Sequence, residues 1–466
     1  MRRNTRYIIN SIVAALLLLF VMVSPAQAAF PYPINQPDAF TDDPPPLTPD
    51  TNPTITIEDV EVLPQLNLAP TFNFWYGPNQ SFGQRGNPQS QINILGNITG
   101  ETVTSLKYRL NGGSEITVPV GQDTPRLVRT GDFNIALNIT DLNNGTNTLT
   151  ITAGTGGTTF QFNYVPNQVP SLPYTLNWTT ASPLNSQAQV VDGLWTMTSA
   201  GPRVQQTGYD RLIGLGDMSW QNYEVLVPIT VHSWPVGGEG GVGIIANWVG
   251  HGGPESLPDD WWLMGAYGYY SNKSGSEGGL AMYINQNIRY KTTRSVFSMP
   301  TGVTYLFKLR AERLSSTSTR YSLKAWQQGT AEPAWTSSTF SEVYNRTDSP
   351  DVQTNGGILL VAHHADATFG DVNVCPLIGA NYTLTTNTSG SGSVSRSPNK
   401  SQYACGEGVS LTANPAPGWE FVRWQGDSNS TSATIHTNIV KATSLTAVFQ
   451  FTASMNEKVF IPQALK

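Results

Sequence analysis

Apolar and polar residues alternate with a period of two along most of this chain. In "SLKYRLNGGSEITVPV" (residues 105–120), Leu106, Tyr108 and Leu110 fall on one face, and Asn111-Gly112-Gly113 then marks a hairpin turn before a second alternating run. Similar runs separated by Gly and Asn recur up to residue 450, and no sustained 3.6-residue period lies between them. The pattern predicts an all-β chain.

Proline-rich stretches divide this pattern into modules. Residues 31–53 contain eight prolines, which predicts an extended tether at 29–53, and three more prolines interrupt the pattern at 165–173. The unit between them, 54–165, has the short strands of a small sandwich. Its segment "GDFNIALNITDLNNGTNTLTITA" (131–153) resembles the closing strands of bacterial immunoglobulin-like modules. We interpret this Ig-like unit as a spacer without a site.

The longest unit, residues 171–375, contains closely spaced strand patterns such as "GGVGIIANWV" and "GGILLVAHHADATFGDVNV". About 200 residues of this kind predict a jelly-roll sandwich. Its "DMSWQNYEVLVPITV" and "FGDVNV" resemble the opening and closing strands of concanavalin A-like lectin/glucanase domains. Because that superfamily holds lectins, binding modules, glycosidases and lyases, the resemblance implies a fold and a polysaccharide ligand but no single activity.

A third unit, residues 381–450, resembles the B-repeat of internalin-like bacterial surface proteins. The resemblance implies a stalk or adhesion module, and Cys405 departs from the pattern. The tail, 451–466, is short and apolar; it fits a frayed or strand-like terminus or, alternatively, a sorting signal. The residues that carry the B-repeat resemblance are Tyr403, Gly406, Val409, Leu411, Pro415, Gly418, Trp419, Phe421, Trp424, Gly426 and Asp427.

The N-terminus predicts export. Residues 1–28 combine three arginines, an apolar core from Ile12 to Val23, and the small-x-small sequence Ala26-Gln27-Ala28. A membrane anchor fits less well, because the core is shorter than the roughly 20 residues that span a bilayer. Cleavage after Ala28 would leave a chain without a spanning segment, which places the protein outside the cell or at the cell surface.

The net charge bears on the class of binding partner, and the cysteines bear on a possible disulfide. Removing residues 1–28 takes away three positive and no negative charges, so the net charge moves from −6 to −9, which argues against a nucleic-acid partner. The two cysteines, Cys375 and Cys405, are 30 residues apart. In an exported chain such a pair predicts a disulfide, and two free thiols are the alternative. The position of Cys375 at the end of the preceding unit supports the bridge.

Catalytic signals are weak. The Glu-x-Asp-x-x-Glu strand motif of glucanases is absent from 171–375, and so is a Gly-x-Ser-x-Gly elbow. Alternation predicts that His363 and His364 point to opposite faces, which disfavours a metal pair. Asp217 and Asp371 could hold a structural calcium, although their spacing does not support it. We therefore predict no cofactor, and an enzyme is the less favoured alternative.

The stretch "DDWWLMGAYGYY" (259–270) is the strongest candidate site. With Trp248 upstream, six large aromatic residues fall within 23 positions, next to a polar loop rich in Gly and Pro. Sugars stack on aromatic rings and pair their hydroxyl groups with carboxylates and histidine. The alternatives are a core strand and a protein interface. The predicted glycan contacts are Trp248, His251, Asp260, Trp261, Trp262 and Tyr270.

Together these features predict a secreted or cell-surface lectin-like protein that binds a polysaccharide or glycan and carries spacer and adhesion modules. A polysaccharide-degrading glycoside hydrolase or lyase on the same fold is one alternative. A purely structural adhesion protein is the other.

Overall fold

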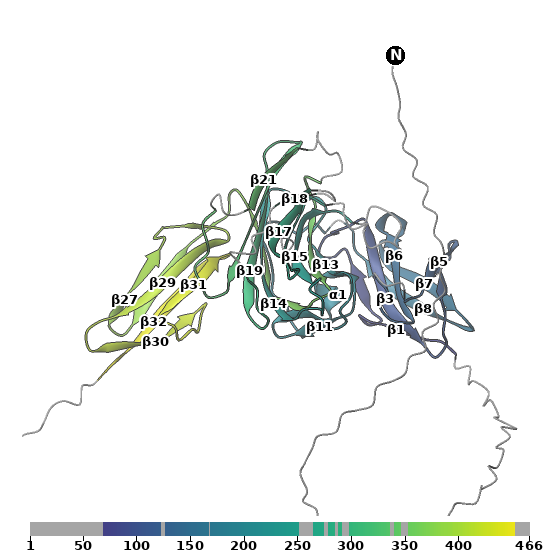
Figure 1. Cartoon of the computed structure of the whole chain (residues 1–466), viewed down its shortest axis with the longest axis horizontal. Coiled ribbons are helices and arrows are strands. Elements are labelled where there is room, and N and C mark those ends of the chain that lie inside the picture. Colours follow the sequence, from purple (N-terminus) through teal and green to yellow (C-terminus); the bar gives the residue numbers. More distant parts are fainter. Residues whose placement is uncertain are drawn as a thin grey trace, which may run out of the picture. The chain divides into compact units, whose positions relative to one another are not determined.

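The computed structural model shows an all-β chain whose compact unit, Leu66–Lys466, contains three β modules (Figure 1). The predicted signal peptide, the tether and most of the C-terminal tail lie outside the described residues, as does segment 251–263. No helix among the described residues is long and apolar enough to cross a membrane. The structure describes residues 69–122, 126–166, 168–250, 264–274, 278–284, 288–290, 298–335, 340–345 and 353–452.

The first module is a two-sheet sandwich. The predicted hairpin is confirmed, because β4 (Ser105–Leu110) pairs with β5 (Glu115–Pro119) across a turn in which Asn111 and Gly112 have φ of 51° and 76°. One sheet has the order β1 (Thr71–Phe74), β3 (Gln91–Thr99), β6 (Asp132–Asn138); the other has β2 (Gln80–Phe82), β8 (Gly156–Tyr164), β7 (Gly145–Ala153), β4, β5, and a 3-10 turn, η1 (Ile139–Asp141), follows β6.

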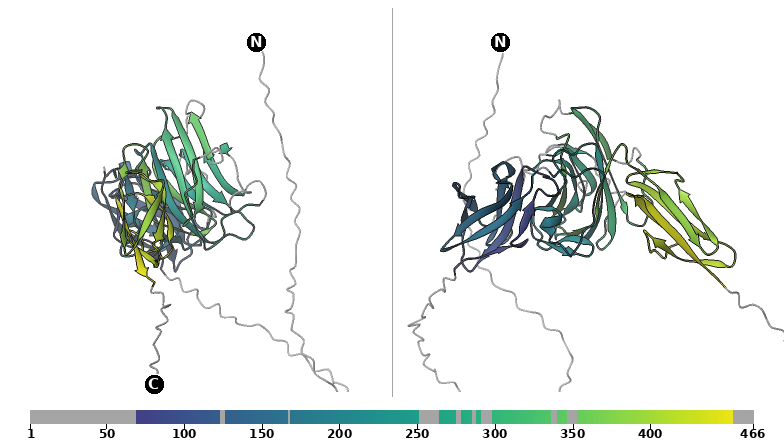
Figure 2. Two further views of the ribbon diagram at one scale, coloured as in Figure 1. Left: turned by 90° about the vertical axis from the view of Figure 1, so that its left-hand side faces the viewer. Right: turned by 180° about the vertical axis from the view of Figure 1, so that it is seen from behind.

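The second module is a larger antiparallel sandwich with a seven-stranded and a nine-stranded sheet. Figure 2 shows its strands from two further sides. The seven-stranded order is β10 (Gln189–Asp192), β13 (Arg211–Leu215), β22 (Gly357–His363), β15 (Gly241–Trp248), β16 (Ala266–Ser271), β17 (Gly279–Ile284), β18 (Ile288–Tyr290). The nine-stranded sheet has β11 (Trp195–Thr198), β12 (Gly201–Val204), β23 (Asp366–Phe369), β14 (Tyr223–Ser233), β19 (Thr304–Arg313), β20 (Ser318–Gln327), β21 (Phe340–Asn345), with β24 (Val372–Pro376) beside β14 and β9 (Tyr174–Leu176). A single short helix turn, α1 (Leu184–Gln187), precedes β10.

The third module is built around the buried Trp424 and is joined to the second by the Cys375–Cys405 disulfide. The predicted bridge is therefore confirmed. The strands form three small sheets: β25 (Asn381–Tyr382) with β28 (Tyr403–Ala404); β26 (Leu384–Ser389), β32 (Thr443–Phe451), β30 (Trp419–Gly426); and β27 (Gly392–Ser397), β29 (Glu407–Pro415), β31 (Thr434–Ile439).

The first module is packed firmly against the second. Tyr76 belongs to the apolar core of the second module, and its hydroxyl donates to the Gly193 carbonyl at 2.6 Å and accepts from the Trp195 backbone N–H at 3.2 Å. Burial raises the pKa of Tyr76, which keeps the phenol in its donating form. The sequence-based interpretation of this module as a spacer without a site did not include this interface.

Candidate binding face of the seven-stranded sheet

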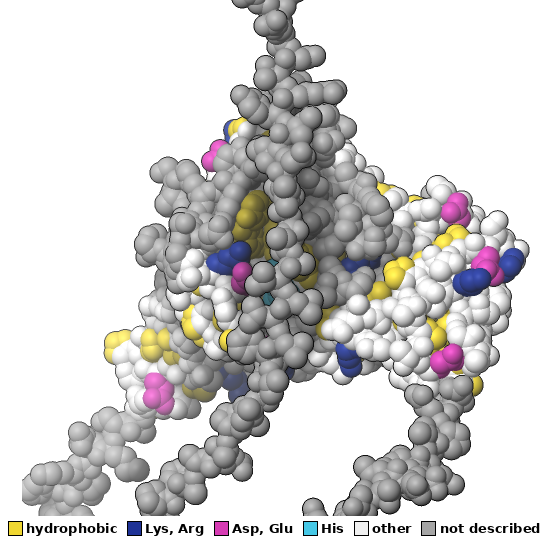
Figure 3. Space-filling model, turned by 45° about the vertical axis from the view of Figure 1, so that its right-hand side comes forward, with side chains coloured by type: hydrophobic (Ala, Val, Ile, Leu, Met, Phe, Trp, Pro, Cys, Tyr) yellow, Lys and Arg dark blue, Asp and Glu magenta, His cyan; other side chains and the backbone are white. Residues whose placement is uncertain are grey.

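The seven-stranded sheet is apolar on both faces. Side chains such as Ile244, Tyr270 and Leu360 point into the core between the two sheets. Because neighbours on a strand alternate, the residues between them form a second apolar cluster on the opposite face. Figure 3 shows hydrophobic side chains gathered in a hollow of the surface, beside histidine and acidic side chains. The members of this second cluster are Val191, Leu212, Ile245, Trp248, Met264, Tyr267, Tyr269, Ala281, Leu359 and Val361, with Tyr283 packed against them.

Three tyrosines of this face stack into a ladder. The rings of Tyr267 and Tyr269 are 4.6 Å apart at an interplanar angle of 16°, and those of Tyr269 and Tyr283 are 5.3 Å apart at 13°. Gly243 makes this possible, because a Cβ there would lie only 2.6 Å from the Cβ of Tyr269. We call Tyr267, Tyr269 and Tyr283 the tyrosine ladder.

The three rings of the ladder differ in their exposure to solvent. Tyr267 and Tyr269 are 6% and 7% exposed, whereas Tyr283 is half-buried. Burial, and then the charge of Asp210, raise the pKa of Tyr267. Tyr283 is therefore the ring of the ladder that can accept a ligand, and the other two hold it in place.

A polar cluster, which we call the histidine corner, lies at one end of the same face and consists of Tyr209, Asp210, His363 and His364. His363 Nδ1 is 2.9 Å from Asp210 Oδ1, and the two imidazole rings are 4.4 Å apart. The Tyr209 ring meets both imidazoles edge-on, at 4.8 and 5.6 Å. The prediction that His363 and His364 point to opposite faces is wrong. β22 ends at His363, and His364 has φ of 51°, so strand alternation no longer applies to it.

Small residues lie beside the histidine corner on the neighbouring strands of the sheet. His363 is in register with Gly241, Gly241 with Ser271, and Ser271 with Gly279. This row of two glycines and one serine is buried, and a Cβ added at Gly241 would lie 3.6 Å from the Tyr269 ring and 3.8 Å from His363 Cβ. Tyr283 lies two strands beyond Gly241 and four residues along β17 from Gly279. The spacing between strands and the rise per residue along a strand together place the Cα of Tyr283 about 20 Å from the Cα of His363. Such a separation suits an extended ligand.

Titration of the corner has a predictable effect on stability. Burial, and then His363, lower the pKa of His364 from its ordinary value of 6.5; Arg211 acts in the same direction, and Asp210 and Glu239 oppose it. The unfolded chain thus takes up a proton on this residue before the folded chain does. The resulting stabilisation is present above pH 6.5 and is lost as the pH falls below that value.

We therefore expect the melting temperature to fall between pH 7.5 and 5.5, and to fall less in His364→Asn. Asparagine tolerates the left-handed backbone and does not titrate. His232, whose pKa is also lowered by burial, remains titratable in both proteins. An equal pH dependence for the two proteins, measured by thermal unfolding, would contradict this role of His364.

Two arginines of the first module, the buried Arg126 and the exposed Arg129, contribute to the contacts around the segment that carries the corner. The Arg126 guanidinium donates to Asp192 Oδ2 at 2.8 Å, and Arg211 Nη1 donates to Asp192 Oδ1 at 3.0 Å and to the Arg126 carbonyl at 3.3 Å. Arg129 Nη2 donates to Gln206 Oε1 at 2.8 Å. The segment 206–211, which carries Tyr209 and Asp210, is thus fixed at both ends.

The structure places two of the six predicted glycan contacts in apolar interiors. Tyr270 packs in the core between the two sheets and is 9% exposed, and Trp248 is fully buried on the opposite face. His251, Asp260, Trp261 and Trp262 lie outside the described residues. The glycan role of the six residues stays a prediction.

The spacing of the ladder tyrosines in the sequence is itself a signal of their common face. In "AYGYYS" (266–271), Tyr267 and Tyr269 are two apart and must share a face, whereas Tyr270 falls on the other face.

The carboxylates considered for calcium accept hydrogen bonds from the protein. Asp217 accepts from the Asn87 and Ser219 backbone N–H groups at 3.0 and 2.9 Å, and Asp371 from the Trp178 backbone N–H at 2.9 Å. Within the described ranges, no three His, Cys, Asp or Glu side chains gather as a metal site. Asp217 and Asp371 therefore stabilise loops by accepting hydrogen bonds from backbone N–H groups.

Comparison with known proteins adds a family for the third module and a likeness of fold for the second. Residues 382–453 match the divergent InlB B-repeat domain family, as the sequence resemblance predicted. The sequence matches no curated protein.

Among solved structures, the chain is similar to the VIP36 exoplasmic/lumenal domain in its Ca²⁺/Man3GlcNAc-bound form, with 11% identity over 41% of this chain and 84% of that chain and a TM-score of 0.27. It is also similar to the metal-free Emp46p carbohydrate recognition domain (9% identity, 44% and 97% covered, TM-score 0.31). A legume lectin-like domain from Entamoeba histolytica is similar at 6% identity, with 40% and 88% covered and a TM-score of 0.26. These likenesses concern the fold alone.

Proposed function

We propose that the protein is a secreted or cell-surface glycan-binding protein whose ligand lies across the outer face of the seven-stranded sheet. The observation that carries the proposal is the tyrosine ladder ending in a half-buried ring, with the histidine corner on the same face. A sugar ring can stack on Tyr283, and hydroxyl groups further along the chain can bond with His363 and Tyr209. The separation of about 20 Å favours an oligosaccharide or polysaccharide over a single sugar.

The remaining features of the proposal come from the sequence and the fold. The signal sequence would export the chain, and the disulfide suits an oxidising compartment. The B-repeat and the proline-rich segment would display the sandwich at a distance from the cell. The concanavalin A-like character of the sandwich and the Ig-like character of the first module belong to the same proposal.

Tyr283→Ala in the full mature chain should weaken polysaccharide binding about 5- to 150-fold, the loss typical of removing a stacked aromatic ring worth about 1–3 kcal/mol. A panel of soluble polysaccharides, screened by affinity electrophoresis, first identifies the ligand, and titration then measures the loss. Tyr174→Ala, a half-buried tyrosine on β9 that packs on Trp220, is the matched control and should bind normally.

The outcomes separate this proposal from the sequence-based one. Loss of binding in Tyr270→Ala but not in Tyr283→Ala would move the ligand to the predicted residues and refute the ladder site. If no member of the panel binds, the purely structural alternative is favoured.

A polysaccharide-degrading activity is the second candidate, and the His363–Asp210 pair is the observation that favours it. An imidazole oriented by a buried carboxylate can act as a general base. His363 retains 27% side-chain exposure, whereas Asp210 retains 6%. Release of reducing ends or of unsaturated sugar from the same panel, abolished in His363→Gln, would establish it.

A further inference from the structure

At the junction of the second and third modules, a buried lysine and a half-buried asparagine contact the same half-buried glutamate. Lys308 lies on β19, Glu332 follows β20, and Asn438 lies on β31. Lys308 Nζ is 2.6 Å from Glu332 Oε1, and the Asn438 side-chain amide donates to Glu332 Oε2. The side chains of Lys308 and Glu332 are 2% and 12% exposed. We call these three residues the junction triad.

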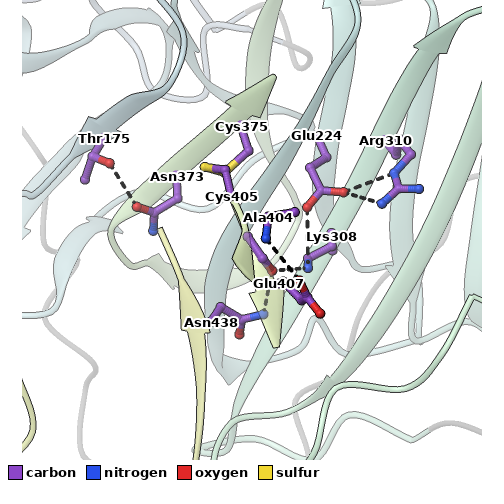
Figure 4. The surroundings of a disulfide bond; sticks show 11 residues. Thr175, Glu224, Lys308, Arg310, Asn373, Cys375, Ala404, Cys405, Glu407 and Asn438 are labelled. Atoms are coloured by element: carbon purple, nitrogen blue, oxygen red, sulfur yellow. Dashed lines mark hydrogen bonds and ion pairs between the residues drawn. A yellow bond between two sulfur atoms is a disulfide. The ribbon is translucent and has the colours of Figure 1, made fainter. Parts of the chain in front are cut away.

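A second shared acceptor holds the two nitrogen atoms close together. The Gly406 carbonyl accepts from Lys308 Nζ at 2.6 Å and from Asn438 Nδ2 at 3.0 Å. In Figure 4, Lys308 and Asn438 approach this part of the third module from two sides, next to the Cys375–Cys405 disulfide. The Lys308 amine of one module and the Asn438 amide of the other therefore share two acceptors, Glu332 and the Gly406 carbonyl.

Glu332 has a second lysine partner. Lys324 Nζ also lies 2.6 Å from Glu332 Oε1 and is 4.2 Å from the centre of the Trp335 ring, and Lys308 Nζ is 5.7 Å from the centre of the Trp326 ring. Burial lowers the pKa of Lys324. For Glu332, burial acts the other way, but Lys308 and Lys324 together lower its pKa, so its side chain is held as a carboxylate between the two lysines.

We propose that Lys308 and Asn438 join in an intramolecular isopeptide bond, with Glu332 as the proton carrier. Glu332 takes a proton from the Lys308 ammonium, and the neutral amine attacks Cγ of Asn438. The Nζ–Cγ bond forms and the Cγ–Nδ2 bond breaks. Nζ gives up two protons in all: one completes the leaving ammonia and the other leaves with it as ammonium, which restores the Glu332 carboxylate. The reaction needs no oxidant and no cofactor.

Such a bond would tie the B-repeat to the sandwich by a link that reducing agents cannot break. The disulfide at the same junction would then be a second link, sensitive to reduction. This inference does not depend on the proposed glycan site.

Mass spectrometry of the reduced, full mature chain tests the bond. The intact mass should be about 17 Da below the mass calculated from the sequence, because one ammonia is lost. Trypsin should fail to cleave after Lys308, and residues 295–310 should be recovered joined to residues 424–441. An unmodified intact mass, with both peptides recovered separately, would overturn the proposal.

Two variants and a control identify the chemistry. Glu332→Gln keeps the shape of the side chain but cannot accept the proton, so it should restore the full mass, as should Asn438→Ala. Asn414→Ala, an exposed asparagine on β29 of the same module, should leave the loss of ammonia unchanged. A cross-link that persists in Asn438→Ala would show that another residue is the acceptor and would contradict the assignment. The wild-type mass alone decides the proposal if a variant fails to fold.

Discussion

Asp192→Ala is expected to destabilise the folded chain by about 3–5 kcal/mol, the loss that follows when one partner of a buried ion pair is removed. Asp192 lies between two arginines, and the side chains of Asp192, Arg126 and Arg211 are 3%, 6% and 1% exposed. Without the carboxylate, two buried guanidinium groups would lose the counter-charge that they share. Equilibrium unfolding in urea measures the loss.

The physical reason lies in the cost of burying charge. Burial raises the pKa of Asp192, and the two arginines act against that rise. The ionised carboxylate is thus held in the interior by Arg211 and Arg126, and they in turn depend on it. Because Arg126 belongs to the first module, the variant should also loosen that module from the sandwich.

An exposed ion pair of the first module provides the control. Glu115 contacts Lys107 at 2.9 Å and Arg109 at 3.2 Å on the surface. Because solvent screens such exposed pairs, Glu115→Ala should unfold almost like the wild type. Equal losses of unfolding free energy in Asp192→Ala and Glu115→Ala would show that the buried cluster stabilises the protein no more than an exposed ion pair does.

Strand alternation predicted the architecture because it reports a local property. Residues 105–120 form the hairpin that their pattern predicts, and Trp424, which carries part of the B-repeat resemblance, is fully buried in the core of that module. The disulfide followed from the compartment and from the count of cysteines. Each of these features depends on residues near one another in sequence or on composition.

Alternation failed where the backbone leaves the ideal strand. Asn247 has φ of 53° and lies at a register shift between β15 and β22, so Trp248 shares a face with Ile245 rather than with Ala246. A similar left-handed residue, His364, brings two imidazoles together. Neither position can be read from a period-two pattern, because asparagine and histidine also occur in ordinary strands.

The contacts between modules could not be predicted from the sequence, for a different reason. Arg126 and Asp192 are 66 positions apart, and Lys308 and Asn438 are 130 apart. Nothing in the local sequence of either residue indicates its partner. The ladder is an intermediate case, because the spacing puts Tyr267 and Tyr269 on one face and Tyr270 on the other, but only the fold shows which face lies between the two sheets.

The second large loss of stability is expected from replacing Trp248, which is fully buried. Trp248→Ala should cost about 3–5 kcal/mol of stability, as large-to-small replacements in a core do. The indole lies beside Gly214 of β13, near the first module, since a Cβ added at Gly214 would lie 3.3 Å from the ring and 3.0 Å from Pro88. Its removal would leave a cavity where the two modules meet.

Comparing stability with binding decides between the two interpretations of this tryptophan. If Trp248 is a core residue, Trp248→Ala should melt at a lower temperature and, measured well below that temperature, bind the polysaccharide with nearly the wild-type affinity. Trp234→Ala is a control from the loop after β14, where the ring is only half-buried, and should lose less stability. A selective loss of affinity at unchanged stability would make Trp248 a glycan contact, as its sequence context predicts, and the site would then extend toward Trp261 and Trp262.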